Sequence, residues 1–371
     1  MKSCKHLAVL SIGFAAGMLL APFIASAQES GGELFIYNWS DYIAEDTISN
    51  FEAETGIKVT YDVFDSNEVL EAKLLAGSTG YDLVVPSAAF LGRQVPAGVF
   101  MPLDRAKLSN YDNLDPGLLA RIEVNDPGNR HAVPYLWGTT GIGYNVRKIA
   151  EIFGEDFEVD SWDLVFNPEY AAKISECGFA MLDAASEMIP LALHYLGEDP
   201  NSFDPEVIAR AGEVLLAVRP YVTYFHSSQY INDLANGDIC VAVGWSGDVA
   251  QAAYRAEEAE GGVEVAYAIP QEGAPIWFDT LAIPADARNP GNAHLFINYL
   301  LRPEVIAEIT NYVAYANPNP ASLEFLDEEI RDDPNIFPPP EVMERLFGLK
   351  TLPREVDRVY TRTWTRVRTG R

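Results

Sequence analysis

Three short stretches near the N-terminus decide the fold class: ELFIY (33–37), IKVTYDV (57–63) and YDLVV (81–85). Each is rich in β-branched and aromatic residues, so each predicts a β-strand. Between them, residues 48–56 and 65–77 carry helix start and stop signals, including a glycine at each end point. This strand–helix–strand–helix–strand order predicts a parallel sheet with helices on both faces.

The same alternation returns later in the chain. We predict further strands and helices there, the strands at 178–182, 239–244, 263–269 and 278–283, the helices at 292–301 and 304–312. Two such units in 371 residues favour two α/β lobes over one domain. Crossovers between the lobes are expected near 138–143 and near 274–279.

Residues 1–27 are predicted to be a cleavable signal peptide. Lys2 and Lys5 give a positive start, residues 7–20 are mostly apolar, and Ala25-Ser26-Ala27 fits the small-residue cleavage pattern. A retained membrane anchor is the alternative. We therefore expect a protein that is exported to the periplasm.

The composition excludes several functional classes. The chain is 48% hydrophobic and 22% charged, which is typical of a globular protein and not of a disordered one. Its net charge of −28 disfavours nucleic acid or an anionic membrane as partner, and weakly favours a cationic ligand.

Two cysteines remain after the predicted leader, Cys177 and Cys240. An even pair in an exported protein is expected to be oxidised. Two buried free thiols are the alternative, because spacing alone does not show that the residues are close.

Motifs for catalysis, metals or cofactors are weak. Gly244-Trp245-Ser246-Gly247 approaches a nucleophile elbow, but Asp248 stands where the last glycine would be. Gly141-Ile142-Gly143 lacks the third glycine of a dinucleotide loop, and the five histidines show no ligand spacing. We expect no enzyme activity, no metal and no cofactor.

The residues just after predicted strands share one chemistry. They are indoles, phenols, hydroxyls and carboxylates, without a Lys or Arg among them: Trp39, Ser40, Asp41, Tyr42, Ser87, Asp183, Glu187, Trp245 and Asp248. Trp277 and Asp279 open a late strand near the expected crossover. Ligands of open parallel sheets bind beyond these strand ends. Carboxylates accept hydrogen bonds from ammonium groups and aromatic faces attract cations, so this set suits an elongated cation.

Some of these residues have a simpler structural interpretation. Asp41 and Ser87 can each be a helix N-cap without contacting a ligand. Trp39 and Trp245 can be ordinary core aromatics, and Asp183 is expected to be structural.

Several longer motifs resemble one protein family. They are YNWSDYI (37–43), DVFDSNE (62–68), GTTGIGYN (138–145), FHSSQYINDLA (225–235) and GWSGD (244–248). The chain from about Glu33 to its C-terminus resembles the periplasmic polyamine-binding proteins of ABC transporters, above all those that bind putrescine.

The resemblance implies a fold, a site and partners. The fold would be that of type II periplasmic binding proteins: two α/β lobes joined by a hinge, with the ligand between them. Lobe 1 would comprise 28–137 plus about 264–310, and lobe 2 about 138–263 plus 311–371. The protein would bind putrescine, spermidine or both, deliver them to permease subunits in the inner membrane, and act as a monomer.

The resemblance also assigns roles to site residues. Aromatic walls are implied for Trp39, Tyr42, Trp245, Trp277 and Tyr315; ammonium contacts for Asp41, Asp248 and Asp279; a carboxylate acting through water for Glu187; and hydroxyl contacts for Ser40 and Ser87. The family disulfide would map onto Cys177–Cys240. Where the family has Phe, this chain has Trp277, and we hypothesise that the larger indole favours the longer spermidine or at least widens the specificity.

Three alternatives stay open. The first is a binding protein for another small cation or solute, the second is a sensor on the same scaffold, and the third is an enzyme on that scaffold.

Four arginines recur every four residues on a predicted helix near the C-terminus: Arg354, Arg358, Arg362 and Arg366. This pattern suits either a docking face for an acidic partner or a solvated stripe.

Overall fold

The computed structural model describes residues 32–371. The predicted signal peptide lies outside these residues. None of the helices in the described part of the chain is long and apolar enough to cross a membrane.

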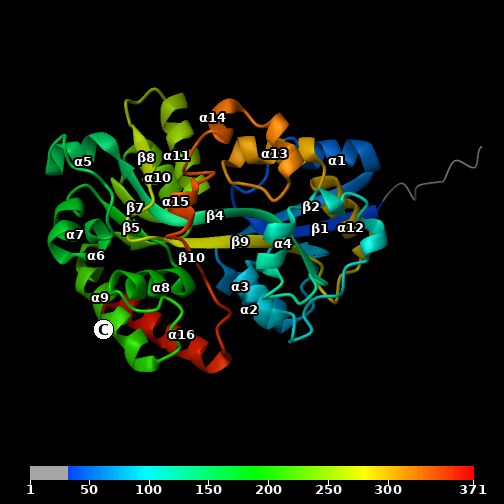
Figure 1. Cartoon of the computed structure of the whole chain (residues 1–371), viewed down its shortest axis with the longest axis horizontal. Helices are drawn as coiled ribbons and strands as arrows, with labels where there is room; N and C mark the ends of the chain where they lie inside the picture. The colour runs from blue at the N-terminus through cyan, green and yellow to red at the C-terminus, as the bar shows by residue number, and fades with distance from the viewer. Residues whose placement is uncertain (1–31) are drawn as a thin grey trace, which may run out of the picture. The chain divides into compact units, whose positions relative to one another are not determined.

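The strands of the described residues form one mixed sheet (Figure 1). They are β1 Gly32–Trp39, β2 Ile57–Phe64, β3 Leu83–Val84, β4 Ala132–Asn145, β5 Phe179–Met181, β6 Tyr224–Phe225, β7 Val241–Trp245, β8 Val265–Ala268, β9 Pro275–Ala282 and β10 Phe347–Gly348. Their order is β2-β1-β3-β9-β4-β7-β5-β6, with β10 beside β9 and β8 beside β4.

Sixteen α-helices of the described residues connect and cover these strands. They are α1 Thr47–Thr55, α2 Asn67–Ala76, α3 Ala88–Gln94, α4 Pro116–Ile122, α5 Val146–Phe153, α6 Asp163–Phe166, α7 Pro168–Ile174, α8 Ala185–Tyr195, α9 Pro205–Val218, α10 Gln229–Asn236, α11 Ser246–Glu258, α12 Pro290–Leu300, α13 Pro303–Val313, α14 Glu328–Arg331, α15 Pro340–Met343 and α16 Arg354–Thr369. In Figure 1, α16 lies in red beside α8 and α9.

The N-terminal unit follows the prediction closely. β1 pairs in parallel with both β2 and β3. The first helix ends at Gly56, which takes the left-handed conformation with φ of 72°. Ser66 begins the second helix, and its side chain accepts a hydrogen bond of 3.2 Å from the Val69 N–H. The predicted α/β fold is therefore confirmed, but the predicted parallel sheet holds only in part, because β9 pairs antiparallel with β3 and β4, and β4 pairs antiparallel with β7 and β8.

The longest strand was not predicted. β4 covers fourteen residues and pairs antiparallel with β9 through residues 132–139, and with β7 and β8, which lie on its two opposite edges, through its later residues. Within the stretch 138–143, where we expected a crossover, the pairing partner of β4 changes: residues 132–139 pair with β9 and residues 140–144 pair with β7. The glycines of this stretch lie inside the strand, where neighbouring side chains fill their space, since a Cβ on Gly143 would lie 2.7 Å from Val249.

Buried apolar side chains form two large clusters on this sheet. One gathers around β1, β3 and the C-terminal half of β9, with Leu34, Val84 and Leu281 among its members. The other gathers around β5 and β7, and α16 packs onto it through Tyr360 and Trp364.

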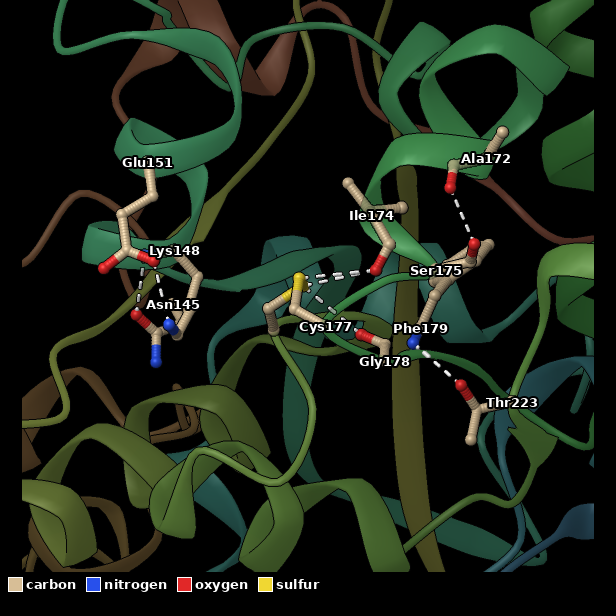
Figure 2. Close-up of a disulfide and its surroundings, with 11 residues drawn as sticks. Asn145, Lys148, Glu151, Ala172, Ile174, Ser175, Cys177, Gly178, Phe179 and Thr223 are labelled. Carbon is tan, nitrogen blue, oxygen red and sulfur yellow. Dashed lines mark hydrogen bonds and ion pairs between the residues drawn. A yellow bond between two sulfur atoms is a disulfide. The ribbon is translucent and has the colours of Figure 1, made fainter.

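The predicted disulfide between Cys177 and Cys240 is present (Figure 2). The two Cα atoms are 5.5 Å apart, and the bond closes a loop with a sequence separation of 63 residues. It joins the segment after α7 to the start of β7, within the second apolar cluster. The bond therefore stabilises the framework from which Trp245 projects.

Candidate ligand-binding site

A narrow cavity of about 30 Å³ lies where the predicted site residues meet. We call it the aromatic cavity, and its wall comprises Trp39, Ser40, Tyr42, Asn67, Ser87, Glu187, Trp245, Asp248, Trp277, Asp279 and Tyr315. Ten of the eleven predicted ligand-binding residues are in this wall, from elements far apart in the sequence.

Five rings enclose the cavity at near-perpendicular angles. Trp39 meets Trp245 edge-on with centroids 5.4 Å apart, and Trp277 meets Tyr315 at the same distance. Tyr42 closes the set against Tyr315 at 5.1 Å. Because edge-on packing turns ring faces in different directions, such walls can surround a methylene chain and attract a cation.

Asp248 lies in the first turn of α11, at the carboxyl end of β7. Its two oxygens accept hydrogen bonds from the Tyr315 and Tyr230 hydroxyls, at 2.6 and 2.7 Å. Burial outweighs these donors and raises the pKa of Asp248 to about 7. The carboxyl group is thus fixed in orientation but carries no neutralising cation inside the cavity.

Asp279 lies on β9 and is held in a similar way. Ser87 Oγ donates to one oxygen at 2.5 Å, and the Tyr42 hydroxyl donates to the other at 2.9 Å. Burial raises the pKa of Asp279 to about 7. Ser87 occupies the N-cap position of α3, yet its side chain makes no capping hydrogen bond, because the hydroxyl is used by Asp279.

Glu187 provides the third buried carboxyl group, from the first turn of α8. Thr140 Oγ1 donates to it at 2.8 Å. Burial raises its pKa to about 7, and the nearby carboxylates of Glu68 and Asp279 act in the same direction. No Lys, Arg or His is present among the described residues of the cavity wall. A buried charge is stable only when paired, so these groups favour a cationic ligand.

The structure does not bring Asp41 into the cavity wall. Its carboxylate forms an ion pair of 2.6 Å with Arg255, outside the aromatic cavity. The N-cap interpretation does not hold either, because α1 begins at Thr47 with Asp46 as its N-cap. Asp183 is also outside the wall: it accepts from Trp364 Nε1 at 2.8 Å and pairs with Arg368.

Sequence reasoning missed Asn67. Its amide donates to Ser87 Oγ at 2.8 Å and accepts from the Ser87 N–H at 3.0 Å, which positions the hydroxyl that contacts Asp279. The strand-end rule contained the signal, because Asn67 follows the end of β2 at the sheet edge that carries Trp39.

Gly138 lies opposite Trp277 across the β4–β9 pair. A Cβ at this position would lie 3.0 Å from the indole ring and 2.9 Å from Ser246 Oγ. The absent side chain therefore gives Trp277 the room to form one wall of the cavity.

No cluster of three or more metal-ligating side chains occurs in the described part of the chain. The wall presents carboxyl groups and ring faces, which are the groups that bind an organic cation.

Comparison with known proteins gives a consistent result. Residues 46–338 match the family of bacterial extracellular solute-binding proteins. The chain is 55% identical over 97% of both lengths to a putrescine-binding periplasmic protein of Escherichia coli. It is 46% identical to a putrescine/agmatine-binding protein of Pseudomonas aeruginosa, over 97% of this chain and 98% of the relative. Among solved structures, a spermidine/putrescine ABC transporter protein of Listeria monocytogenes matches with a TM-score of 0.81 and 34% identity, covering 91% of this chain and 99% of that one.

Proposed function

The chain belongs to the bacterial extracellular solute-binding proteins, and we propose that it captures a polyamine, putrescine first of all, for an ABC-transporter permease. Membership of this family confirms the expectation that the chain is a solute-binding protein and not an enzyme. The observation that carries the polyamine ligand is the aromatic cavity, with three buried carboxyl groups and no basic residue among its described wall residues. The names of relatives at 55% and 46% identity, with putrescine and agmatine as ligands, support the same class.

The proposed binding mode follows from the positions of the carboxyl groups. One ammonium of a diamine would pair with Asp248 and the other with Asp279, while Glu187 provides a further acceptor. The methylenes would lie between the rings of Trp39, Trp245 and Trp277. Because desolvated ammonium groups are costly, each needs an acceptor, and an amino acid would bring a carboxylate into an acidic cavity.

We propose that ligand binding closes the cavity between two lobes. Lobe 1 would comprise 28–137 and about 264–310, and lobe 2 about 138–263 and 311–371. The two separate apolar clusters support this division. The Asp41–Arg255 pair is suited to hold the closed state at the protein surface, which gives Asp41 an indirect role.

The periplasmic location of the relatives supports export of this protein and docking onto a permease in the inner membrane. We propose that it acts there as a monomer.

Calorimetric titration tests the proposed ligand. The purified protein is unfolded and refolded to remove bound amine, then titrated with putrescine, spermidine and glutamate. We expect one-to-one binding of a polyamine and no heat with glutamate. Absence of both heat and thermal stabilisation with every polyamine would exclude the proposed function.

A further inference from the structure

A second and much larger cavity, of about 340 Å³, adjoins the aromatic cavity. We call it the outer chamber. The two share Asn67, Ser87, Glu187 and Trp277 in their walls. The remaining wall of the outer chamber comes from α3, α4, α8, β9, the segment 343–352 and Tyr360 of α16. The outer chamber therefore lies next to the aromatic cavity, with Glu187 in the wall that both share.

The charge of the outer chamber is opposite to that of the aromatic cavity. Glu187, in the shared wall, is the one acidic residue among the described lining residues, which also include Arg93, Arg121 and Lys350. Arg93 is neutralised by Glu71 at 2.5 Å and Asp357 at 3.2 Å. Arg121 and Lys350 are exposed and form no ion pair with any residue of 32–371. These two cations would repel an ammonium and attract an anion.

Two buried hydrogen-bonding groups of the chamber wall have no partner among the described residues. They are the Trp277 indole N–H and the Tyr360 hydroxyl, on side chains that are 9% and 2% exposed. An indole N–H only donates, and an ammonium group has no lone pair to accept from it. A carbonyl or carboxylate oxygen is the partner that the indole N–H requires, and such an oxygen can also accept from the Tyr360 hydroxyl.

We propose that the outer chamber is a subsite for the acyl end of a monoacylated diamine, with a terminal carboxylate on the acyl group. This inference rests on the proposed function, because the free ammonium of the ligand occupies the aromatic cavity beside Asp248. Asp248 lines the aromatic cavity alone, whereas Glu187 and Ser87 lie at the junction.

The amide of such a ligand fits the junction. Its N–H donates to the carboxyl group of Asp279 or Glu187, and its carbonyl accepts from the Trp277 indole N–H. The acyl chain then passes along Phe90, Leu346 and Leu352, and its carboxylate reaches Arg121 and Lys350 at the outer wall. From the sequence alone, the larger indole of Trp277 favours a triamine, spermidine, as the ligand. The third ammonium of a triamine, however, would find no carboxylate beyond Glu187 among the described lining residues.

Titration calorimetry with four probes tests this subsite: putrescine, N-succinylputrescine, N-acetylputrescine and spermidine. We expect N-succinylputrescine to bind more tightly than N-acetylputrescine. In the Arg121→Gln and Lys350→Gln variants, its affinity should fall about two- to fivefold each, the range for exposed charge pairs. Affinity for putrescine should stay unchanged. Arg358→Gln, which removes an exposed charge of α16 that does not line the chamber, serves as the matched control.

The outcomes separate the two proposals. If putrescine binds but neither acylated diamine does, the subsite is excluded and the proposed function stands. If spermidine binds more tightly than N-succinylputrescine and Arg121→Gln strengthens spermidine binding, the chamber holds an ammonium and the subsite is equally excluded. If no probe binds at all, the proposed function itself fails.

Discussion

The two adjoining cavities solve different recognition problems with different means. The aromatic cavity is narrow, about 30 Å³, and its three carboxyl groups are buried among rings. The outer chamber is about 340 Å³, and its two unpaired cations lie exposed at the outer wall. Buried charges act strongly because water does not screen them, whereas exposed charges act weakly. Under the proposed function, the aromatic cavity would therefore decide whether an amine binds, and the outer chamber would adjust which amine derivative is preferred.

The largest effect on ligand affinity is expected when a buried carboxyl group of the aromatic cavity is removed. Asp248→Asn would leave one ammonium of the ligand without its charged acceptor. We expect a loss of about 3–5 kcal/mol in binding free energy, the cost of breaking a buried ion pair. Calorimetric titration with putrescine measures it.

Asp332→Asn is the matched control for this variant, because it is the same substitution at an exposed ion pair, with Arg331, outside both cavity walls. Its cost should stay within about 1 kcal/mol. Equal losses in the two variants would show that Asp248 has no special place in the cavity.

A second variant changes the shape of the aromatic cavity without changing a charge. A Cβ at position 247 would lie 2.5 Å from the Tyr315 ring. Gly247→Ala must therefore displace this ring, and we expect a loss of about 1–3 kcal/mol in putrescine binding.

Gly261→Ala provides the control for this substitution, since its Cβ would meet no atom within 4 Å. The measurement is again titration calorimetry, with circular dichroism to verify that both variants fold. Unchanged affinity in Gly247→Ala would mean that Tyr315 does not form the cavity wall in solution.

The pH dependence of binding should report the buried carboxyl groups directly. The pKa values of Glu187, Asp248 and Asp279 are each raised to about 7 by burial. A cationic ligand needs the ionised form, so binding should release protons below pH 7. Affinity should rise on the order of tenfold per pH unit there, for each carboxyl group that ionises, and level off above about pH 8.

The stability of the ligand-free protein should change in the opposite sense. A carboxyl group whose folded pKa exceeds its unfolded value stabilises the fold at low pH, and this contribution is lost as the pH rises through about 7. The increase in melting temperature caused by putrescine should thus be larger at pH 8 than at pH 6. An affinity that stays constant from pH 5.5 to 8 would contradict the ionisation of these groups on binding.

The smallest effect is expected in the outer chamber. Tyr360→Phe removes a buried hydroxyl that has no partner among the described residues. Because no hydrogen bond is lost, stability should stay unchanged or rise by about 1 kcal/mol, and putrescine affinity should not change. Thermal unfolding and calorimetry check both. A marked loss of putrescine binding would show that the two cavities act as one site.

Much of the fold and most of the cavity wall could be predicted because both depend on local signals. The parallel pairing of β1, β2 and β3 follows from strand composition and from glycine and serine at helix ends. Trp39, Ser87 and Trp245 could be selected because strand ends meet at one edge of a sheet.

What could not be predicted depends on contacts across the chain. In α2 the apolar residues Leu70 and Leu74 are buried, whereas Val69 and Leu75 beside them are 46% and 60% exposed, a difference that the apolar pattern alone does not show. The glycines of β4 do not predict a continuous strand, because nothing local shows that neighbouring side chains fill their space. Asp41 carries the residue type of a ligand contact, and only the position of Arg255, more than two hundred residues later, shows where its charge goes.

The close approach of Gly138 to Trp277 has a consequence for how such a protein can evolve. A Cβ at 138 would lie 3.0 Å from the indole, so a side chain there requires the indole ring to shift. A smaller ring at 277 would remove this constraint, and a side chain gained at 138 would then disfavour the return of the indole. The order in which the two positions change during evolution is therefore biased, and so is a change of ligand preference made through this pair.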